Sequence, residues 1–222
     1  SIYHLHARDE LGKLTADTST LEAIIGQVSA SSPALFEAST GGVSQLTRGE
    51  RLAPVLIGGV DFASLNMGSL NIADTVFVNT LPDIRFWLEG IRAAGVVPTL
   101  EIFDAGHLHL VKVLVEEGHL APPFVLSFVF GMRWGMPFSE ELLAYLVKRV
   151  PRNVPWGANL IASIDFTNLR MAASHGAHIV RVGFEDSRII DGRPASSNRA
   201  LVEGLRTELE RNGFRIVSAA EA

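Results

Sequence analysis

Apolar and polar positions along this chain follow two patterns. Short runs rich in β-forming residues alternate with longer segments in which apolar residues have helical spacing. The clearest helical segments are residues 83–94 and 198–211, and in the first the apolar side chains repeat on one face. Gly95 follows directly, as is typical of the residue that ends a helix. The runs that predict strands are 2–7, 34–40, 62–67, 99–104, 124–130, 157–163 and 178–184. Because helical segments separate the strands, we expect parallel pairing in an α/β fold.

The polar residues favour a closed (β/α)8 barrel, or TIM barrel, over an open doubly wound sheet. An open sheet of this kind usually carries a Gly-rich nucleotide-binding turn after its first strand, and neither GxGxxG nor GxxxxGK[ST] occurs here. A barrel instead gathers reactive residues at the carboxyl ends of several strands. Five predicted strands end in such residues, namely His4 and His6, Ser39 and Thr40, Ser64 and Asn66, Glu101 and Asp104, and Glu185 and Asp186.

Seven predicted βα units are one fewer than a complete barrel contains. The sequence also begins without Met and inside a predicted strand, and no linker rich in Pro, Gly or Ser divides it. We therefore expect a single TIM-barrel domain over residues 1–222, with its first strand and helix, roughly 40 residues, lying upstream.

Composition narrows the function class. The net charge of −5 without a basic stripe argues against a nucleic-acid partner. The absence of Cys excludes disulfides and thiol catalysis. The longest apolar runs, of about nine residues, are too short to span a membrane, and the first ten residues lack the pattern of a signal peptide. We expect a globular, cytoplasmic enzyme with no membrane partner.

The segment YHLHARD indicates one half of a metal site. His4 and His6 are two residues apart, so on a strand both rings point to the same side, and paired histidines are common zinc ligands. A pair of buried, hydrogen-bonded histidines is the alternative. In RVGFEDS, residues 181, 183 and 185 alternate with apolar ones, so Glu185 is placed to supply a third ligand and leave a fourth position open.

Arg181 and Asp186 suggest a general base held by a guanidinium, since a buried Arg is rarely left without a carboxylate. A purely structural ion pair is the alternative. The segments STGG and SLNMGSLN place Ser39, Thr40, Ser64 and Asn66 where they can bind a carboxylate or carbonyl oxygen, although such residues also form ordinary turns. Glu101 is an inward carboxylate that should meet a cation, a metal-bound group or a substrate amine.

In combination these motifs resemble the β-keto acid cleavage enzymes, whose founding activity is 3-keto-5-aminohexanoate cleavage. The resemblance runs in the family's order from Tyr3 to Asp186 through HLHARD, STGG, ERLAP, ASLNMGSLN, LEIFDAGHL, GMP and HIVRVGFED. It implies a TIM barrel, a catalytic Zn²⁺ and a homotetramer. It also implies a reaction in which a β-keto acid and acetyl-CoA give acetoacetate and a new acyl-CoA.

The resemblance also implies roles for individual residues. It implies that His4, His6 and Glu185 bind zinc, that Asp186 is the base and that Arg181 supports it. It implies substrate contacts from Ser39 or Thr40, from Ser64 and from Glu101.

Two departures from the family pattern concern the substrate. The family's first strand, which carries a substrate-facing acid, is absent from the sequence. The loop GMRWGMP replaces a smaller, Gly-rich loop, and Arg133 and Trp134 in it favour a small or medium keto acid.

The residues leave three alternative functions open. A metal-dependent hydrolase is disfavoured because residues 99–104 and 124–130 contain no further His or Lys. A metal-dependent aldolase or lyase needs the same enolate chemistry but no acetyl-CoA. A non-catalytic barrel is the third.

Overall fold

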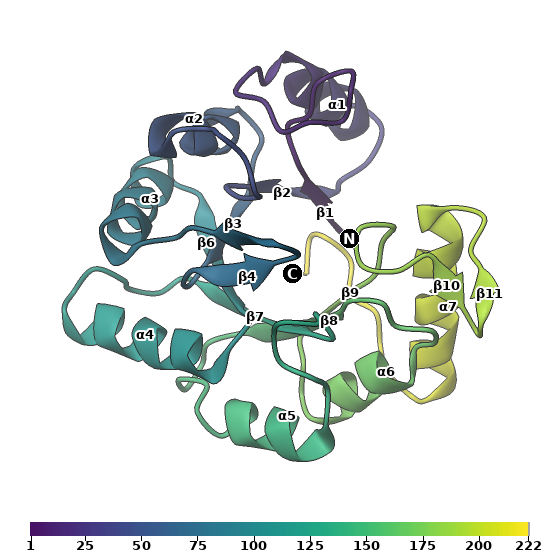
Figure 1. Cartoon of the computed structure of the whole chain (residues 1–222). Coiled ribbons are helices and arrows are strands. Elements are labelled where there is room, and N and C mark those ends of the chain that lie inside the picture. The colour runs from purple at the N-terminus through teal and green to yellow at the C-terminus, as the bar shows by residue number, and fades with distance from the viewer. Residues whose placement is uncertain (222) are drawn as a thin grey trace. The chain divides into compact units, whose positions relative to one another are not determined.

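The computed structural model describes residues 1–221 and divides them into two compact units. Unit 1 contains residues 1–101, 110–124 and 218–221, and unit 2 contains residues 102–109 and 125–217. Figure 1 shows the strands and helices of both units. Among the helices that the described residues form, none is long and apolar enough to cross a membrane.

Unit 1 is built on parallel strands with crossover segments between them. The strands are β1 (Ile2–Leu5), β2 (Leu35–Ser39), β3 (Phe62–Asn66) and β6 (Val97–Ile102), whose last residue belongs to unit 2. The crossovers contain α1 (Ser19–Ser29), α2 (Arg48–Leu52), the 3-10 helix η1 (Ala53–Leu56), the hairpin of β4 (Leu70–Ile72) with β5 (Thr75–Phe77), and α3 (Leu81–Ala93). Helix α4 (Ala105–Glu116) starts in unit 2 and ends in unit 1.

Unit 2 repeats the same pattern with three parallel strands. The strands are β7 (Val125–Phe130), β8 (Trp156–Leu160) and β9 (Ile179–Arg181), and the helices are α5 (Glu140–Val147), α6 (Thr167–Ser174) and α7 (Asn198–Arg211). A short hairpin of β10 (Ile189–Ile190) and β11 (Arg193–Pro194) precedes α7. All five residues of β8 are buried, and a Cβ on its Gly157 would lie 2.7 Å from the Ile179 carbonyl oxygen. Glycine therefore allows β8 and β9 to approach closely.

Helix α3 shows how the sequence sets the ends of an element. The Thr80 side chain accepts a hydrogen bond from the Asp83 N–H and caps the helix. Pro82 fits the first turn, where its missing N–H has no intrahelical partner to lose. The buried face contains Ile84, Trp87, Leu88 and Ile91. Gly95 follows with φ +71°, which confirms its predicted role at the end of the helix.

Each of the seven predicted strands is present, with ends that differ by a few residues. The largest consequence for the site comes from the last strand, because β9 ends at Arg181 rather than at residue 184. The N–H groups of Asp186 and Ser187 both donate to the Gly183 carbonyl oxygen at 2.9 Å, so the chain turns there. The prediction that Glu185 lies on an alternating strand is therefore wrong, and a turn positions it instead. Both hairpins were also missed.

Arg51 of α2 ties three segments of unit 1 together. Its Nε donates to the Thr40 carbonyl oxygen at 2.8 Å, its Nη1 to the Val78 carbonyl oxygen at 3.0 Å and its Nη2 to Asn79 Oδ1 at 2.6 Å. The guanidinium also lies over the Trp87 ring, 3.9 Å from its centroid. Burial lowers the pKa of Arg51 to about 10, against the opposing charge of Asp83. The group remains cationic near neutral pH, so these contacts are charge-assisted.

We expect Arg51→Met to lower the free energy of unfolding by about 2–4 kcal/mol, because it leaves several acceptors without their donor. Arg51→Lys should recover only part of this loss, since an ammonium does not reproduce the planar fork. Arg48→Met is the matched control on the same helix, because the Arg48 side chain is 57% exposed and its ion pair with Asp83 is 3.9 Å long. Urea unfolding of the three variants measures the effect. Equal stability of Arg51→Met and the parent would show that these contacts contribute nothing.

His107, in the first turn of α4, makes the stability of the fold depend on pH. The ring is buried and its Nδ1 accepts a hydrogen bond from the Phe103 N–H at 3.3 Å. Burial lowers the pKa of His107 below its ordinary value of 6.5, while the charge of Asp104 opposes the shift. As pH falls through 6.5, the unfolded chain therefore takes up this proton before the folded one does.

We expect the parent to lose stability between about pH 7.5 and about pH 5.5, and His107→Gln to lose less over this range. Gln can still accept from the Phe103 N–H but does not titrate. His109→Gln is the control, because His109 is exposed on the same helix. Urea unfolding at the two pH values gives the comparison. The same pH-dependent loss in parent and His107→Gln would refute the role of His107.

Candidate active site

The β1–β2 register of unit 1 brings a histidine and a glutamate together. His4 of β1 and Glu37 of β2 are directly paired in the parallel ladder. Their side chains are 10% and 11% exposed, and His4 Nδ1 lies 2.6 Å from Glu37 Oε2. A carboxylate oxygen accepts, so the proton of His4 lies on Nδ1. In the neutral ring, His4 Nε2 then carries a lone pair, which is the form of imidazole that binds metals and which accepts from His6 Nε2 in the contact between the two rings.

His6 is the first residue after β1, and its ring lies next to Nε2 of His4. The Nε2 atoms of His4 and His6 are 3.2 Å apart, and the rings meet edge to face at 77°. This confirms the prediction that both rings share one side. Two nitrogens that each bind a tetrahedral zinc ion at about 2.0–2.1 Å would lie about 3.3 Å apart. The two rings are hydrogen bonded at this distance, as the alternative reading of the pair expected, and the same separation also fits two ligands of one zinc ion.

The strand-end polar residues of unit 1 are buried, as expected for a site lined by strand termini. Ser39, Thr40, Ser64 and Asn66 are each less than 9% exposed. Ser39 is paired with Ser64 and Asn66 with Glu101 in the ladders of β2, β3 and β6. The parallel register therefore brings these predicted residues to the same ends of neighbouring strands.

The hydroxyl groups of Ser39 and Thr40 have different surroundings. Thr40 Oγ1 donates to the Ser64 carbonyl oxygen at 2.7 Å, which fastens the end of β2 to β3. Ser39 Oγ accepts from the Gly41 N–H at 3.2 Å and donates to the Gly41 carbonyl oxygen at 3.3 Å. Ser39, Thr40 and Gly41 also line a hollow together with Leu14 and Arg51. The STGG segment thus forms a polar part of the lining of this hollow. The hydrogen bond from Arg51 to the Thr40 carbonyl oxygen holds the segment in place.

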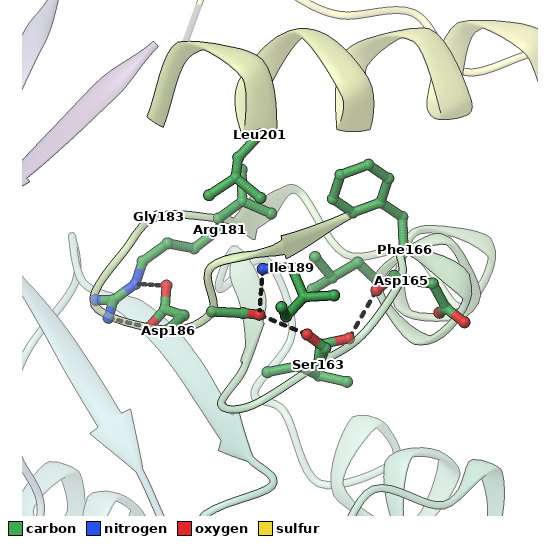
Figure 2. Close-up of a pocket in the computed structure, with 12 residues that line it drawn as sticks. Ser163, Asp165, Phe166, Arg181, Gly183, Asp186, Ile189 and Leu201 are labelled. Carbon is green, nitrogen blue, oxygen red and sulfur yellow. Dashed lines mark hydrogen bonds and ion pairs between the residues drawn. The ribbon is translucent and has the colours of Figure 1, made fainter. Parts of the chain in front are cut away.

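In unit 2, Asp186 and Arg181 form a bidentate pair (Figure 2). Arg181 Nε lies 2.8 Å from Asp186 Oδ2, and Arg181 Nη2 lies 2.5 Å from Asp186 Oδ1. The Asp186 side chain is only 3% exposed, and the Arg181 side chain 21%. A buried carboxylate needs such a partner because desolvation of an isolated charge is costly. The predicted Arg–Asp pairing is confirmed.

Hydrogen bonds to residues 162 and 163 fasten the turn after β9, which also carries a second acid. The Asp186 carbonyl oxygen accepts from the Ala162 N–H at 2.8 Å, and Ser187 Oγ donates to the Ser163 carbonyl oxygen at 2.5 Å. Glu185 Oε2 lies 3.3 Å from Arg181 Nη2, and its side chain is 49% exposed. One guanidinium therefore contacts both acids of the FED segment.

A small pocket of unit 2 adjoins the Arg181–Asp186 pair. Its lining combines these two charged residues with Gly183 and the apolar side chains of Phe166 and Leu201 (Figure 2). Arg181 and Asp186 lie toward one end of the pocket, whereas Asp165 lies toward the other. The carboxylate of Asp186 thus lies beside a largely apolar space, where electrostatic interactions are stronger than in water.

Two polar groups escaped the sequence-based predictions. Glu37 lies in the middle of the apolar run LFEAS, and its alternation with Ser39 was the available signal. Asn159 is 1% exposed in β8, accepts from Ser127 Oγ at 3.2 Å and is paired with Arg181 in the β8–β9 ladder. The sequence around Asn159 reads as a purely buried strand, so only the structure reveals this contact.

The chain is similar to known proteins over its whole length. A sequence model of the family described as beta-keto acid cleavage enzyme matches residues 1–222. A 3-keto-5-aminohexanoate cleavage enzyme of Acetoanaerobium sticklandii is 32% identical over 225 residues, covering 100% of this chain and 82% of that protein. A 3,5-dioxohexanoate:acetyl-CoA acetone transferase of Paraburkholderia graminis is 30% identical over 254 residues, covering 100% of this chain and 81% of that protein.

The solved structures point to the same fold. The structure titled "Apo structure of ObcA" superposes with a TM-score of 0.82 at 18% identity and covers 99% of this chain. This chain spans 59% of the ObcA chain, or about three fifths of its length. The likeness confirms the predicted α/β fold of the TIM-barrel class. With a family match over its whole length and relatives at 30–32% identity, the chain belongs to the β-keto acid cleavage enzymes.

Proposed function

We propose that this protein condenses a β-keto acid with acetyl-CoA to give acetoacetate and a new acyl-CoA. The observation that carries the proposal is the buried Asp186 carboxylate, held in two hydrogen bonds by Arg181 within the family's RVGFED motif. Family membership and the names of relatives that use acetyl-CoA support it. Such a reaction requires a base that can remove a proton next to a carbonyl group.

We also propose that zinc is held by His4, His6 and Glu185. The 3.2 Å separation of the two histidine Nε2 atoms and the half-exposed carboxylate of Glu185 support this assignment. Two imidazole nitrogens and one carboxylate oxygen are a donor set that catalytic zinc sites use, with a further position for substrate. When bound, zinc supplies a Lewis acid for the keto oxygen and carboxylate of the substrate.

In this mechanism Asp186 removes the proton from C2 of the keto acid. Each of its oxygens accepts one hydrogen bond from Arg181, and a carboxylate offers about four acceptor positions. A position for the proton therefore remains, while Arg181 fixes the orientation of the group. The C2 carbanion then attacks the thioester carbonyl of acetyl-CoA, a new C–C bond forms, and the CoA thiolate leaves.

The thiolate next attacks the original keto carbon. The bond between that carbon and C2 breaks, which releases the new acyl-CoA and the carbanion of acetoacetate. Asp186 returns its proton to this carbanion, so the enzyme regains its starting state. All atoms and charges balance without any further reactant.

For the keto acid we propose contacts from Ser39 or Thr40, from Ser64 and Asn66, and from Glu101. The Thr40 hydroxyl donates to the Ser64 carbonyl oxygen at 2.7 Å, whereas the Ser39 hydroxyl donates to the Gly41 carbonyl oxygen at the longer distance of 3.3 Å, which favours Ser39 as the hydroxyl that binds substrate. Glu101 suits a substituent that carries a positive charge or a donor group. Arg133 lies over the ring of the half-exposed Trp134 in the loop after β7, and this bulky pair favours small or medium keto acids.

The upstream βα unit that would complete a single domain, the homotetramer and the cytoplasmic location stay predictions from the sequence and from the family resemblance. Size-exclusion chromatography with light scattering tests the tetramer.

We expect a panel of β-keto acids to release acetoacetate only when acetyl-CoA is present, with one new acyl-CoA formed per acetoacetate. Mass spectrometry of both products on the zinc-loaded protein measures this ratio. Cleavage without acetyl-CoA would instead support a metal-dependent aldolase or lyase. A complete lack of turnover across the panel would support a non-catalytic barrel. Faster turnover of long keto acids than of short ones would contradict the size preference.

We expect Asp186→Asn to retain its zinc while turnover falls by about 10²–10⁴, the usual contribution of a general base. Asn keeps the shape of the side chain and can still accept from Arg181, but it cannot take up the proton. Asp165→Asn is the matched control, because Asp165 lines the opposite end of the same pocket. Its turnover should stay within a few-fold of the parent. Turnover of Asp186→Asn that also stays near the parent value would exclude Asp186 as the base.

A further inference from the structure

We infer that Glu37 is a positioning residue that holds His4 in its metal-binding form and strengthens zinc binding. The inference rests on the zinc site of the proposed function. It concerns a residue of β2 that the sequence-based assignment left out. Glu37 and His4 are direct neighbours in the β1–β2 ladder, and the 2.6 Å contact joins Glu37 Oε2 to the nitrogen that faces away from His6.

The burial of Glu37 is the first reason to assign it a role. The residue is only 9% exposed, and the other residues of its strand are apolar or small. Removing a carboxylate from water costs several kcal/mol unless a positive or strongly donating group compensates. A neutral imidazole compensates this cost less well than an imidazole that carries positive charge. A cation bound to Nε2 of His4 would draw electron density from the ring and strengthen the Nδ1–H···O contact.

The tautomer of His4 is the second reason. A histidine whose Nδ1–H is held by a carboxylate keeps Nε2 free of a proton, and such partners orient the ring and raise its basicity toward a metal. His4 Nε2 is the atom that lies 3.2 Å from His6 Nε2. Glu37 therefore directs the lone pair of His4 toward the place that the two histidines share.

The rigidity of the scaffold is the third reason. His4 and Glu37 lie on paired strands, so their backbones are fixed relative to each other by the ladder rather than by a loop. A ligand built on strands is held more closely to its binding geometry than one on a flexible segment. Phe36, beside Glu37, is 2% exposed, and its N–H donates to Asp61 Oδ2 at 2.8 Å. This contact anchors β2 to Asp61, the residue that directly precedes β3.

The decisive experiment compares zinc affinity in the parent, Glu37→Gln and Asp61→Asn by competition with a chromophoric chelator. Glu37→Gln keeps the size and an acceptor oxygen but loses the charge, and we expect its Kd for zinc to rise about 10–100-fold. Asp61→Asn removes a partly buried carboxylate that contacts the same strand through the backbone, so its Kd should stay within a few-fold of the parent. His4→Ala, which removes the ligand itself, should weaken binding more than Glu37→Gln does.

A second measurement separates orientation of the ligand from a general structural effect. In the metal-free parent, ¹⁵N-detected imidazole spectra should show His4 with its proton on Nδ1, and in Glu37→Gln that preference should decrease. Equal zinc affinity in parent and Glu37→Gln, with tight binding in both, would overturn the inference and leave the proposed reaction intact. A parent that binds no zinc would overturn both this inference and the proposed zinc site.

Discussion

Neighbouring parallel strands place residues from distant segments side by side, and this register decides which polar side chains of the first unit meet. His4 stands beside Glu37, Ser39 beside Ser64, and Asn66 beside Glu101. A shift of one residue would turn each of these side chains to the other face of the sheet. The buried apolar residues between them resist such a shift, since it would move them to the face that carries the polar pairs. The hydrophobic alternation of each strand therefore fixes the polar pairs as well as the core.

Charge burial is the second constraint, and the molecule meets it in three ways. Asp186 is neutralised by a bidentate guanidinium within the same turn. Arg51 is surrounded by carbonyl oxygens and an aromatic face, which satisfy its donors without a carboxylate in direct hydrogen-bond contact. Glu37 meets an imidazole, whose charge depends on what its other nitrogen binds. Of these contacts, the one between Glu37 and His4 is therefore the one whose strength would change if the proposed zinc bound to His4.

The sequence predicts most of the scaffold because periodicity reports burial directly. Each predicted strand exists, residues 198–211 form α7, and the pairing of His4 with His6 and of Arg181 with Asp186 is confirmed. The turn after Arg181 was missed because the apolar residues Val182 and Phe184 alternate with polar ones, which is also the pattern of a strand. The decisive feature was Gly183, whose carbonyl accepts two N–H groups. Glu37 and Arg51 were missed for another reason. Alternation with Ser39 places Glu37 on the polar face of its strand, but the partners of Glu37 and Arg51 lie 33 and 11 to 28 residues away, and a single sequence does not show which distant residues pair.

Arg181 contacts both acids of the FED segment, and the difference between the two contacts supports the different roles proposed for Asp186 and Glu185. Asp186 receives two hydrogen bonds and is almost fully buried, so it is fixed in orientation and protected from water. Glu185 meets the same guanidinium in one longer contact of 3.3 Å, and its side chain is 49% exposed, so it is the more accessible of the two acids. A base requires a fixed lone pair near the reacting carbon, whereas a ligand requires an accessible one. With the two acids exchanged, the proposed zinc would meet a carboxylate whose two oxygens are both hydrogen bonded to Arg181. The exchange would also leave proton transfer to a group in contact with solvent. The order of the acids after Gly183 is thus a chemical requirement of the proposed reaction.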